Sequence, residues 1–423
     1  MKARLARLTS SKRFRRLTLL MAVVGPGIIT ANVDNDAGGI TTYSLAGGNF
    51  GYSLLWSLLP IGIFLFIIQE MSSRLGATTG KGLADLMRER FGLKITFWAL
   101  VGLLLANLTN TMSEFAGVAS ASEIFGLTRY VAVPLAAVLV WVIVIKGSYS
   151  SIEKVFLVAC LLYVSYPVSG ILARPDWGVV FRSAVVPEWS FSSDYIMMLV
   201  GIIGTTIAPW MQFYQQAAVA DKGLTSKDMK YARLDVLVGT IGAVVVVFFI
   251  VVTCAATIHA HGKSVTDVKD AAMALFPLAG KYCGGLFALG LLNASLFSAS
   301  ILPLATAYQV SEGMGWERGL DRSFTEAPEF YSVYTLLIVL GAGLVLLPHA
   351  PLLKIMYLSQ VLNGLLLPLV LVFMLLLIND KRLMGEYHNS RTYNILSWLC
   401  VVLVSALGIY LTVVSIAQMF GGK

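Results

Sequence analysis

Two carboxylates interrupt a long apolar stretch near the start of the chain. Asp34 and Asp36 lie in the segment Asn32–Gly39, between an apolar run that begins near Leu17 and one that resumes at Ile40. Carboxylates are costly at membrane depth and persist there when they face a polar cavity, a partner or an ion. The two glycines at the end of the segment favour unwound backbone, which is tolerated where it lines a cavity. The segment therefore predicts half of a cation site.

The composition of the 423 residues is that of a membrane protein. Hydrophobic residues make up 57% and charged residues 13%, whereas a soluble domain carries about 25% charged residues. The four cysteines are scattered without CxxC spacing, so neither a disulfide framework nor a zinc knot is indicated. The net charge of +8 comes mainly from short loops and implies no nucleic-acid partner. The chain has no Ser/His/Asp constellation, phosphate loop or HExxH, so we expect neither an enzyme nor a cofactor.

Eleven apolar segments are candidate membrane spans, most of them near or above the ~20 residues that a bilayer requires. The first and the sixth contain helix breakers, and the fourth and the ninth are short. The spans cover residues 17–46, 50–71, 96–124, 131–147, 152–174, 193–219, 231–258, 283–310, 331–347, 352–378 and 393–419.

The loops predict the orientation. Of the 31 Lys and Arg residues, 23 fall on the side of the N-terminus, and basic loops stay in the cytoplasm. We therefore expect a multi-pass protein of the cell (inner) membrane, with a cytoplasmic N-terminus and, because the number of spans is odd, an extracellular C-terminus.

A second interruption lies five spans after the first. The sixth span contains Gly201–Gln212, in which glycines and Pro209 break the apolar pattern. One such break is often only a kink, but matching breaks in two five-span halves indicate an inverted-repeat transporter with its site at the midplane. The expected organisation is a basic N-terminal arm at 1–16, a first repeat at 17–174, an extracellular loop at 175–192, a second repeat at 193–378, and a loop with the eleventh helix at 379–423.

Five segments distributed along most of the chain carry recognisable motifs. They are Gly25–Gly27 followed by Asp36, then Ala46–Trp56, Ser73–Ala84, Glu114–Gly117 and Ser359–Val361. These segments resemble the Nramp (NRAMP) family of divalent-metal transporters; those near the first two spans are specific, and those in the third and tenth are weaker. This resemblance implies an all-α, LeuT-type fold of eleven transmembrane helices, with a 5+5 inverted repeat and broken helices 1 and 6.

The chain departs from the family at its ligand positions. The family's Asp-Pro-Gly-Asn motif stands here as Asp36–Gly39, so the acid remains and the amide is absent. Its Met-Pro-His motif stands as Ala208–Trp210, so the thioether is absent, and Thr205 replaces the alanine that lends a carbonyl. A glutamine that helps to ligate metal in the family's tenth span corresponds to Leu366. The pattern resembles the Nramp-related magnesium-transporter branch.

These departures favour a hard cation. Thioether sulfur suits soft or borderline metals, whereas Mg²⁺ keeps several waters and binds one or two carboxylates. We expect Asp36 to coordinate the ion, while the Thr205 carbonyl or hydroxyl and carbonyls near Asn32 and Val33 face it or its water shell. The candidate metal-site residues are Asp36, Thr205, Ala208, Gly39, Asp34 and Gln212.

Simpler roles remain open for several of these polar residues. Asp36 is also a possible N-cap, Asp34 a hydrated vestibule charge, and Thr205 a donor to its own helix. Glu114 is either functional or a structural acceptor between helices. His259 and His261, with Asp267, are possible metal ligands, although an exposed loop is the simpler interpretation.

The resulting hypothesis is a monomeric secondary transporter in the lipid bilayer that imports divalent cations, Mg²⁺ foremost and also Mn²⁺, by alternating access. The family's titratable Asp and two His positions are Thr111, Trp210 and Gln215 here, so we expect no obligatory proton coupling, since a relay requires titratable side chains. One alternative is proton-coupled Mn²⁺ or Fe²⁺ uptake, as in the main family. Another is a sodium-coupled amino-acid transporter, although Asp36 would repel a substrate carboxylate.

Overall fold

The described part of the chain is helical. It comprises residues 33–146, 160–320 and 322–420 of a computed structural model, with no side chains described after 414. The long helices are α4 (Ala37–Phe50), α5 (Leu55–Thr79), α7 (Leu93–Ile124), α8 (Arg129–Ile145), α12 (Ser193–Thr206), α13 (Pro209–Asp221), α14 (Met229–Thr257), α17 (Cys283–Met314), α18 (Pro328–Val345), α19 (Leu352–Ile378) and α21 (Arg391–Phe420). The shorter ones are α6 (Leu83–Phe91), α10 (Ser165–Leu172), α11 (Trp177–Val185), α15 (Val268–Ala271), α16 (Phe276–Ala279) and α20 (Lys381–Met384).

Among the described residues, eight helical segments are long and apolar enough to cross a membrane, α12 and α13 together forming one of them. Two shorter apolar helices, Arg129–Ile145 and Leu161–Leu172, coincide with the predicted fourth and fifth spans. Residues 1–32 and 147–159 lie outside the described part of the chain, so the basic arm and portions of the first and fifth spans do as well. The chain is thus an all-helical, multi-pass membrane protein, and the total of eleven spans stays a prediction.

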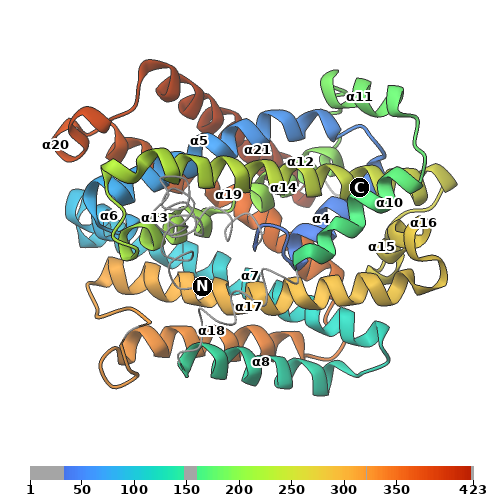
Figure 1. Ribbon diagram of the computed structural model, residues 1–423, viewed down its shortest axis with the longest axis horizontal. Helices are drawn as coiled ribbons and strands as arrows, with labels where there is room; N and C mark the ends of the chain where they lie inside the picture. The colour runs from blue at the N-terminus through green and yellow to red at the C-terminus, as the bar shows by residue number, and fades with distance from the viewer. Residues whose placement is uncertain (1–32, 147–159, 321, 421–423) are drawn as a thin grey trace, which may run out of the picture.

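The helices form two groups with α4 between them (Figure 1). In the lower half of the view, α7, α8, α17 and α18 lie side by side, and in the upper half α5 lies along α14. Helix α4 packs against α12, α14, α19 and α7, and its residues from Ala37 to Gly48 are all buried. The first predicted break therefore lies inside the bundle, away from the surrounding lipid.

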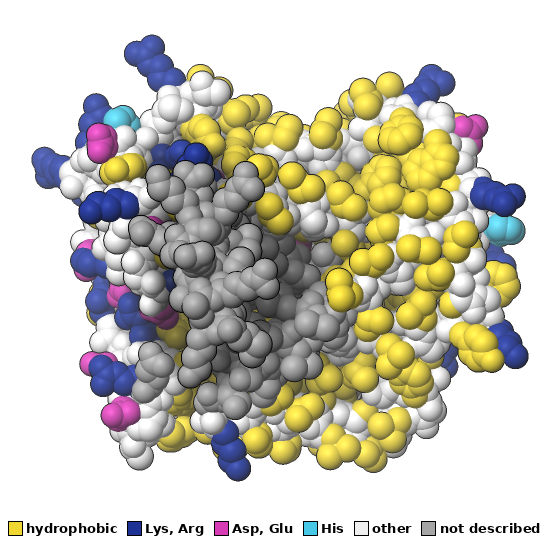
Figure 2. All heavy atoms as spheres, in the orientation of Figure 1, with side chains coloured by type: hydrophobic (Ala, Val, Ile, Leu, Met, Phe, Trp, Pro, Cys, Tyr) yellow, Lys and Arg dark blue, Asp and Glu magenta, His cyan; other side chains and the backbone are white. Residues whose placement is uncertain are grey.

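The molecular surface separates apolar from charged regions. Figure 2 shows hydrophobic side chains over most of the right half of the displayed face, Lys, Arg, Asp and Glu side chains gathered at the left edge, and further Lys and Arg side chains at the right edge. That edge carries α6 and α20 in Figure 1. An apolar band between charged ends is the surface expected of a protein that spans a bilayer.

The sixth predicted span is interrupted at residues 207–208. Helix α12 ends at Thr206, and α13 restarts at Pro209 with Ala208 as its extended N-cap. Proline is suited to the first position of a helix, and its lack of an N–H means that it cannot donate to the carbonyl four residues earlier. The carbonyl of Thr205 consequently loses its ordinary helical donor at the point where the chain unwinds.

Small residues allow the helices around this break to approach closely. A Cβ on Gly204 of α12 would overlap the backbone of Gln360 and Gly364 in α19. A Cβ on Gly117 of α7 would overlap the side chains of Ala37 and Ser295. Such contacts replace the hydrophobic effect as a source of helix association in lipid. They hold α12, α19, α7 and α4 in van der Waals contact near the two predicted half-sites.

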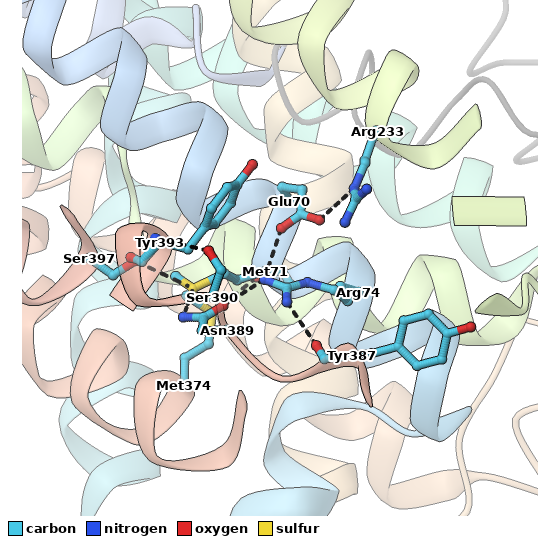
Figure 3. Close-up of polar contacts among 11 residues, drawn as sticks. Glu70, Met71, Arg74, Arg233, Met374, Tyr387, Asn389, Ser390, Tyr393 and Ser397 are labelled. Carbon is cyan, nitrogen blue, oxygen red and sulfur yellow. Dashed lines mark hydrogen bonds and ion pairs between the residues drawn. The ribbon is translucent and has the colours of Figure 1, made fainter. Parts of the chain in front are cut away.

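A buried ionic network joins α5 to two other elements (Figure 3). The carboxylate of Glu70 pairs with Arg74 one turn later at 3.1 Å and with Arg233 of α14 at 2.8 Å. Arg74 also donates to the carbonyl of Tyr387 at 2.8 Å and to Asn389 Oδ1 at 2.6 Å, both between α20 and α21. The network therefore fastens α5, α14 and the start of α21 to one another.

Candidate metal site

Asp36 is the N-cap of α4. Its backbone is extended, with φ −70° and ψ −175°, and its Oδ1 accepts a hydrogen bond of 2.6 Å from the Gly39 N–H. The N-terminus of a helix favours negative charge, so this arrangement fixes an aspartate at 4% exposure. The capping role and the proposed metal role are compatible, because a carboxylate offers two oxygens and about four lone-pair sites.

The turn before α4 carries the second acid. Asp34 is 2% exposed, and among the described residues neither oxygen of its carboxylate has a hydrogen-bond partner. Tyr163, in the short 3₁₀ helix η1 (Cys160–Val164), donates to the backbone carbonyl of Asn35 at 2.9 Å and so anchors the turn. A buried carboxylate without a partner is costly, which makes Asp34 a candidate ligand for a cation or its water.

The C-terminal end of α12 supplies the other half of the candidate site. Thr205 is buried beside Tyr43, and within the described part of the chain its hydroxyl makes no hydrogen bond. The hydroxyl of Thr206 meets that of Tyr43 at 2.9 Å and donates to the carbonyl of Ile202 at 2.7 Å. The C-terminus of a helix carries partial negative charge. Thr205 therefore presents a free hydroxyl and, because of Pro209, a carbonyl without its helical donor.

These groups converge at Gly39. The point that a Cβ on Gly39 would occupy is 2.5 Å from the Asp34 carbonyl oxygen, 3.1 Å from Thr205 Oγ1 and 3.4 Å from Asp36 Oδ1. A backbone carbonyl, a hydroxyl and a carboxylate thus surround one position that bears no side chain. The structure brings together four of the six predicted site residues here: Asp34, Asp36, Gly39 and Thr205.

Glu114 of α7 joins this cluster. Its Oε2 accepts from the Ala37 N–H at 3.3 Å, and its carboxyl group interacts with that of Asp36. Its Oε1 has no hydrogen-bond partner within residues 33–146, 160–320 and 322–420. The residue is completely buried. From the sequence, both a functional and a structural role are open for Glu114, which is not among the candidate metal-site residues; only its place in the Glu114–Gly117 resemblance points to this position.

Ala208 and Gln212 lie on the α13 side of the break. The carbonyl of Ala208 accepts from the Met211 N–H at 3.2 Å and from Gln212 Nε2 at 3.5 Å. The Oε1 of Gln212 accepts from Ser72 of α5 at 3.0 Å. In this structure the Gln212 amide links α13 to α5, and its access to an ion's water shell stays a prediction.

The two histidines near the end of α14 lie within hydrogen-bond distance of backbone carbonyls. His259 Nδ1 lies 3.2 Å from the Gly48 carbonyl, and His261 Nδ1 lies 3.0 Å from that of Thr257. Asp267 instead caps α15. Within the described ranges, no three side chains of His, Cys, Asp or Glu form a metal-binding group. A cation at Gly39 would therefore rely on main-chain and hydroxyl oxygens as well as carboxylates, a donor set that suits hard ions.

Comparison with known proteins identifies the family. The family model described as "Natural resistance-associated macrophage protein-like" (Nramp) matches residues 27–414. The divalent metal cation transporter MntH of Aeromonas hydrophila subsp. hydrophila is 30% identical over 416 residues, which cover 95% of this chain and 97% of the relative. MntH of Yersinia pestis (strain Pestoides F) is 28% identical over 412 residues, which cover 96% of this chain and 97% of the relative.

Solved structures show the same architecture. The Eremococcus coleocola manganese transporter, in complex with an aromatic bis-isothiourea substituted compound, has a TM-score of 0.79 at 22% identity, over 98% of this chain and 90% of that one. MHP1, a nucleobase-cation-symport-1 family transporter in a closed conformation, has a TM-score of 0.59 at 15% identity, over 94% of this chain and 92% of that one. These likenesses establish the fold, and the match over residues 27–414 shows that the chain belongs to the Nramp family.

Proposed function

We propose that this chain is a divalent-metal transporter that moves Mg²⁺, and also Mn²⁺, across the cell membrane by alternating access without obligatory proton coupling. Relatives at 28–30% identity are named divalent metal cation transporters, which supports the general activity. The ion is the cargo, and no resident cofactor is part of the proposal. The preference for Mg²⁺ and the absence of proton coupling come from this chain's own residues.

The oxygen cluster around Gly39 carries the proposal. Carboxylate, carbonyl and hydroxyl oxygens are the ligands of hard cations, and Mg²⁺ retains waters that need hydrogen-bond acceptors. The unpartnered oxygens of Asp34 and Thr205 supply such acceptors within a buried site. At the α12–α13 break, Ala208 offers a methyl group where the family's motif has a thioether, which removes a ligand that favours softer metals.

The absence of proton coupling rests on three positions. Thr111 donates to the Asn107 carbonyl at 2.9 Å, Gln215 donates to Ser73 at 2.8 Å, and Trp210 is buried. None of the three side chains titrates in the physiological range. A membrane proton relay normally uses Asp, Glu or His, so the route expected in the main family lacks three of its carriers here and retains only Glu114.

The architecture that accompanies this activity is an inverted repeat of residues 17–174 and 193–378, with an eleventh helix after residue 379. Two features support it. Helix α4 starts at Ala37 after a turn, and α12 gives way to α13 at Ala208. Breaks that face each other at the site are typical of such transporters. We also propose a monomer with its N-terminus in the cytoplasm.

A second candidate is proton-coupled Mn²⁺ uptake. The observation in its favour is Glu114, a buried carboxyl group beside Asp36 that would be the remaining titratable carrier. The manganese transporter among the structural neighbours supports Mn²⁺ as a cargo only through the shared fold. A sodium-coupled amino-acid transporter has no such support, since the sequence relatives are named metal cation transporters.

The test is metal uptake by the purified chain in liposomes beside Asp36→Ala. We expect Mg²⁺ and Mn²⁺ to enter, Asp36→Ala to abolish both fluxes, and Cd²⁺ or Fe²⁺ to compete weakly. Calorimetric titration of the same two proteins with Mg²⁺ checks binding independently of flux. Strong selection of Cd²⁺ or Fe²⁺ over Mg²⁺ would contradict the proposed cargo and favour the second candidate.

A further inference from the structure

Gln360 of α19 reaches the metal-site turn. A Cβ placed on Gly38 would overlap Nε2 and Cδ of the Gln360 side chain and lie 3.0 Å from its Cγ. Gly38 directly follows Ala37, the first residue of α4, and lies two residues from Asp36. Gln360 is 1% exposed. A side-chain amide from a third helix thus rests against the backbone that holds the proposed ligand.

Two asparagines fix this amide. The Oε1 of Gln360 accepts from Asn363 Nδ2 at 3.0 Å, and Asn363 exchanges two hydrogen bonds with Asn110 of α7, at 2.9 and 3.0 Å. Both asparagines are 1% exposed. An amide nitrogen has two donors, and those of Asn363 are both used, one on Asn110 and one on Gln360.

The direction of the amide follows from Ser359. The Ser359 hydroxyl donates to the Met356 carbonyl at 2.8 Å, so its oxygen can only accept a bond from Gln360. Gln360 Nε2 lies 3.2 Å from that oxygen. The NH₂ end of the amide therefore faces Gly38, while the carbonyl end is held by Asn363. A donor in this place cannot bind a metal ion, but it can donate to an oxygen of the turn or to water on the ion.

The same stretch of α19 also contacts the other half of the site. The backbone carbonyl of Gln360 and the backbone of Gly364 lie against Gly204, the residue before Thr205. A Cβ on Gly364 would in turn overlap the Val200 carbonyl. One turn of α19 therefore touches the residues beside both proposed ligands, Asp36 and Thr205, and is tied to α7 through Asn110.

We propose that Gln360, oriented by Asn363 and Asn110, is a positioning residue that sets the α4 turn for metal binding by presenting its amide NH₂ at Gly38. The inference rests on the proposed function, since it assumes that Asp36 holds a divalent cation. Groups behind a metal's ligands typically change affinity by about 10–100-fold when they are lost. Loss of the Gln360 amide is expected to weaken Mg²⁺ binding within this range.

The first experiment uses Gln360→Leu, which keeps most of the side-chain volume and removes the amide. We expect the Michaelis constant for Mg²⁺ uptake and the calorimetric dissociation constant to rise by roughly 10–100-fold, with the maximum rate near that of the unmodified chain. Gln309→Leu is the matched control, because Gln309 of α17 accepts from Asn107 of α7 at 3.0 Å in a similar buried amide pair. It is expected to change thermal stability without changing the Michaelis constant.

The second experiment tests the contact itself. Gly38→Ala is expected to lose Mg²⁺ binding because its methyl group overlaps Gln360. The double variant Gly38→Ala with Gln360→Ala is expected to match Gln360→Ala alone, since the second change removes the obstructing atoms. Such coupling between two substitutions reports their direct interaction.

Asp36→Ala separates this inference from the proposed function. If Asp36→Ala binds Mg²⁺ as tightly as the unmodified chain, the proposed function fails. If Asp36→Ala loses binding while Gln360→Leu keeps the unmodified constants, the positioning role is overturned alone. An equal change in Gln309→Leu, or a double variant no better than Gly38→Ala, would likewise overturn it.

Discussion

At the scale of single residues, the candidate site consists of oxygens arranged around a glycine, which has no side chain. Gly39 stands where the Asp34 carbonyl, the Thr205 hydroxyl and the Asp36 carboxylate approach one point. Two of the contributing residues, Asp34 and Thr205, have buried oxygens that form no hydrogen bond with any part of the chain that the structure describes. Because unpaired buried polar atoms are costly, their presence indicates a role that folding alone does not explain.

Gly39→Ala is predicted to abolish Mg²⁺ binding. Its methyl group would lie 2.5 Å from the Asp34 carbonyl oxygen, which is too close for a carbon–oxygen contact, so the turn that holds the oxygens must shift. Calorimetric titration with Mg²⁺ measures the loss. Gly290→Ala in α17 is the control, since a Cβ there meets nothing within 4 Å. Unchanged affinity in Gly39→Ala would remove this position from the site.

Thr205→Val is predicted to separate stability from function. Removing a buried hydroxyl that lacks a partner should raise the free energy of unfolding by about 1 kcal/mol, while Mg²⁺ binding weakens. Thr206→Val should lower the free energy of unfolding and leave Mg²⁺ binding unchanged, because it breaks the 2.9 Å bond to Tyr43 and lies outside the oxygen cluster. Thermal unfolding in detergent and Mg²⁺ titration measure the two effects. Lower stability with intact binding in Thr205→Val would assign its hydroxyl to packing.

At the scale of elements, broken helices and close helix contacts produce the site. Pro209 denies the Thr205 carbonyl its donor, and Asp36 caps α4 at the facing break. The N-terminal end of α4 carries partial positive charge, which stabilises the acids, and the C-terminal end of α12 carries partial negative charge, which attracts a cation. Glycines at 117 and 204 let α7 and α19 support these ends from both sides.

Glu70→Gln is predicted to weaken the connection between α5, α14 and α21. Glu70 is completely buried with Arg74, and breaking such a pair leaves an uncompensated charge, at a cost of about 3–5 kcal/mol. We expect a cost at the lower end of this range, because the side chain of Arg233, the second partner of Glu70, is 51% exposed. Thermal unfolding measures the loss. Glu89→Gln is the control, since its pair with Lys81 is about half exposed and contributes roughly 0–1 kcal/mol; equal effects of the two changes would contradict this account.

At the scale of the whole molecule, the bundle buries three acids among apolar helices. Asp34, Asp36 and Glu114 are all at most 4% exposed. An inward-moving divalent cation gains about 4.6 kcal/mol per 100 mV of membrane potential, twice the single-charge value. That energy corresponds to a roughly 2,000-fold accumulation, so voltage alone is a sufficient driving force.

Mg²⁺ uptake into liposomes is therefore predicted to follow an imposed potassium diffusion potential without acidifying the lumen. A pH-sensitive dye and a Mg²⁺ indicator in the same vesicles measure both quantities. Asp36→Ala provides the baseline for leakage. Acidification in proportion to metal flux would contradict voltage-driven uniport and support Glu114 as a proton carrier.

Much of this arrangement was predictable from the sequence because bilayer energetics leave few choices. Apolar runs indicated a helical, multi-pass protein, and Pro209 marked the interruption that the structure places at residues 207–208. The Nramp resemblance, seen in Ala46–Trp56 and Ser73–Ala84, is confirmed by the match over residues 27–414. These conclusions depend on two free-energy costs, that of burying a charge and that of losing a backbone donor. Both costs apply wherever such residues occur, whatever the rest of the fold.

Tertiary structure alone decided which distant residues share the site. Glu114 is 77 positions from Ala37 along the chain, and its contact depends on how α7 packs against α4. The Asn110–Asn363 pair, 253 positions apart, likewise had no local signal. Gln360 stood only within the weak Ser359–Val361 resemblance, which gave no role to its amide. Helical periodicity states which face of a helix a residue occupies, but packing of several helices determines what that face meets.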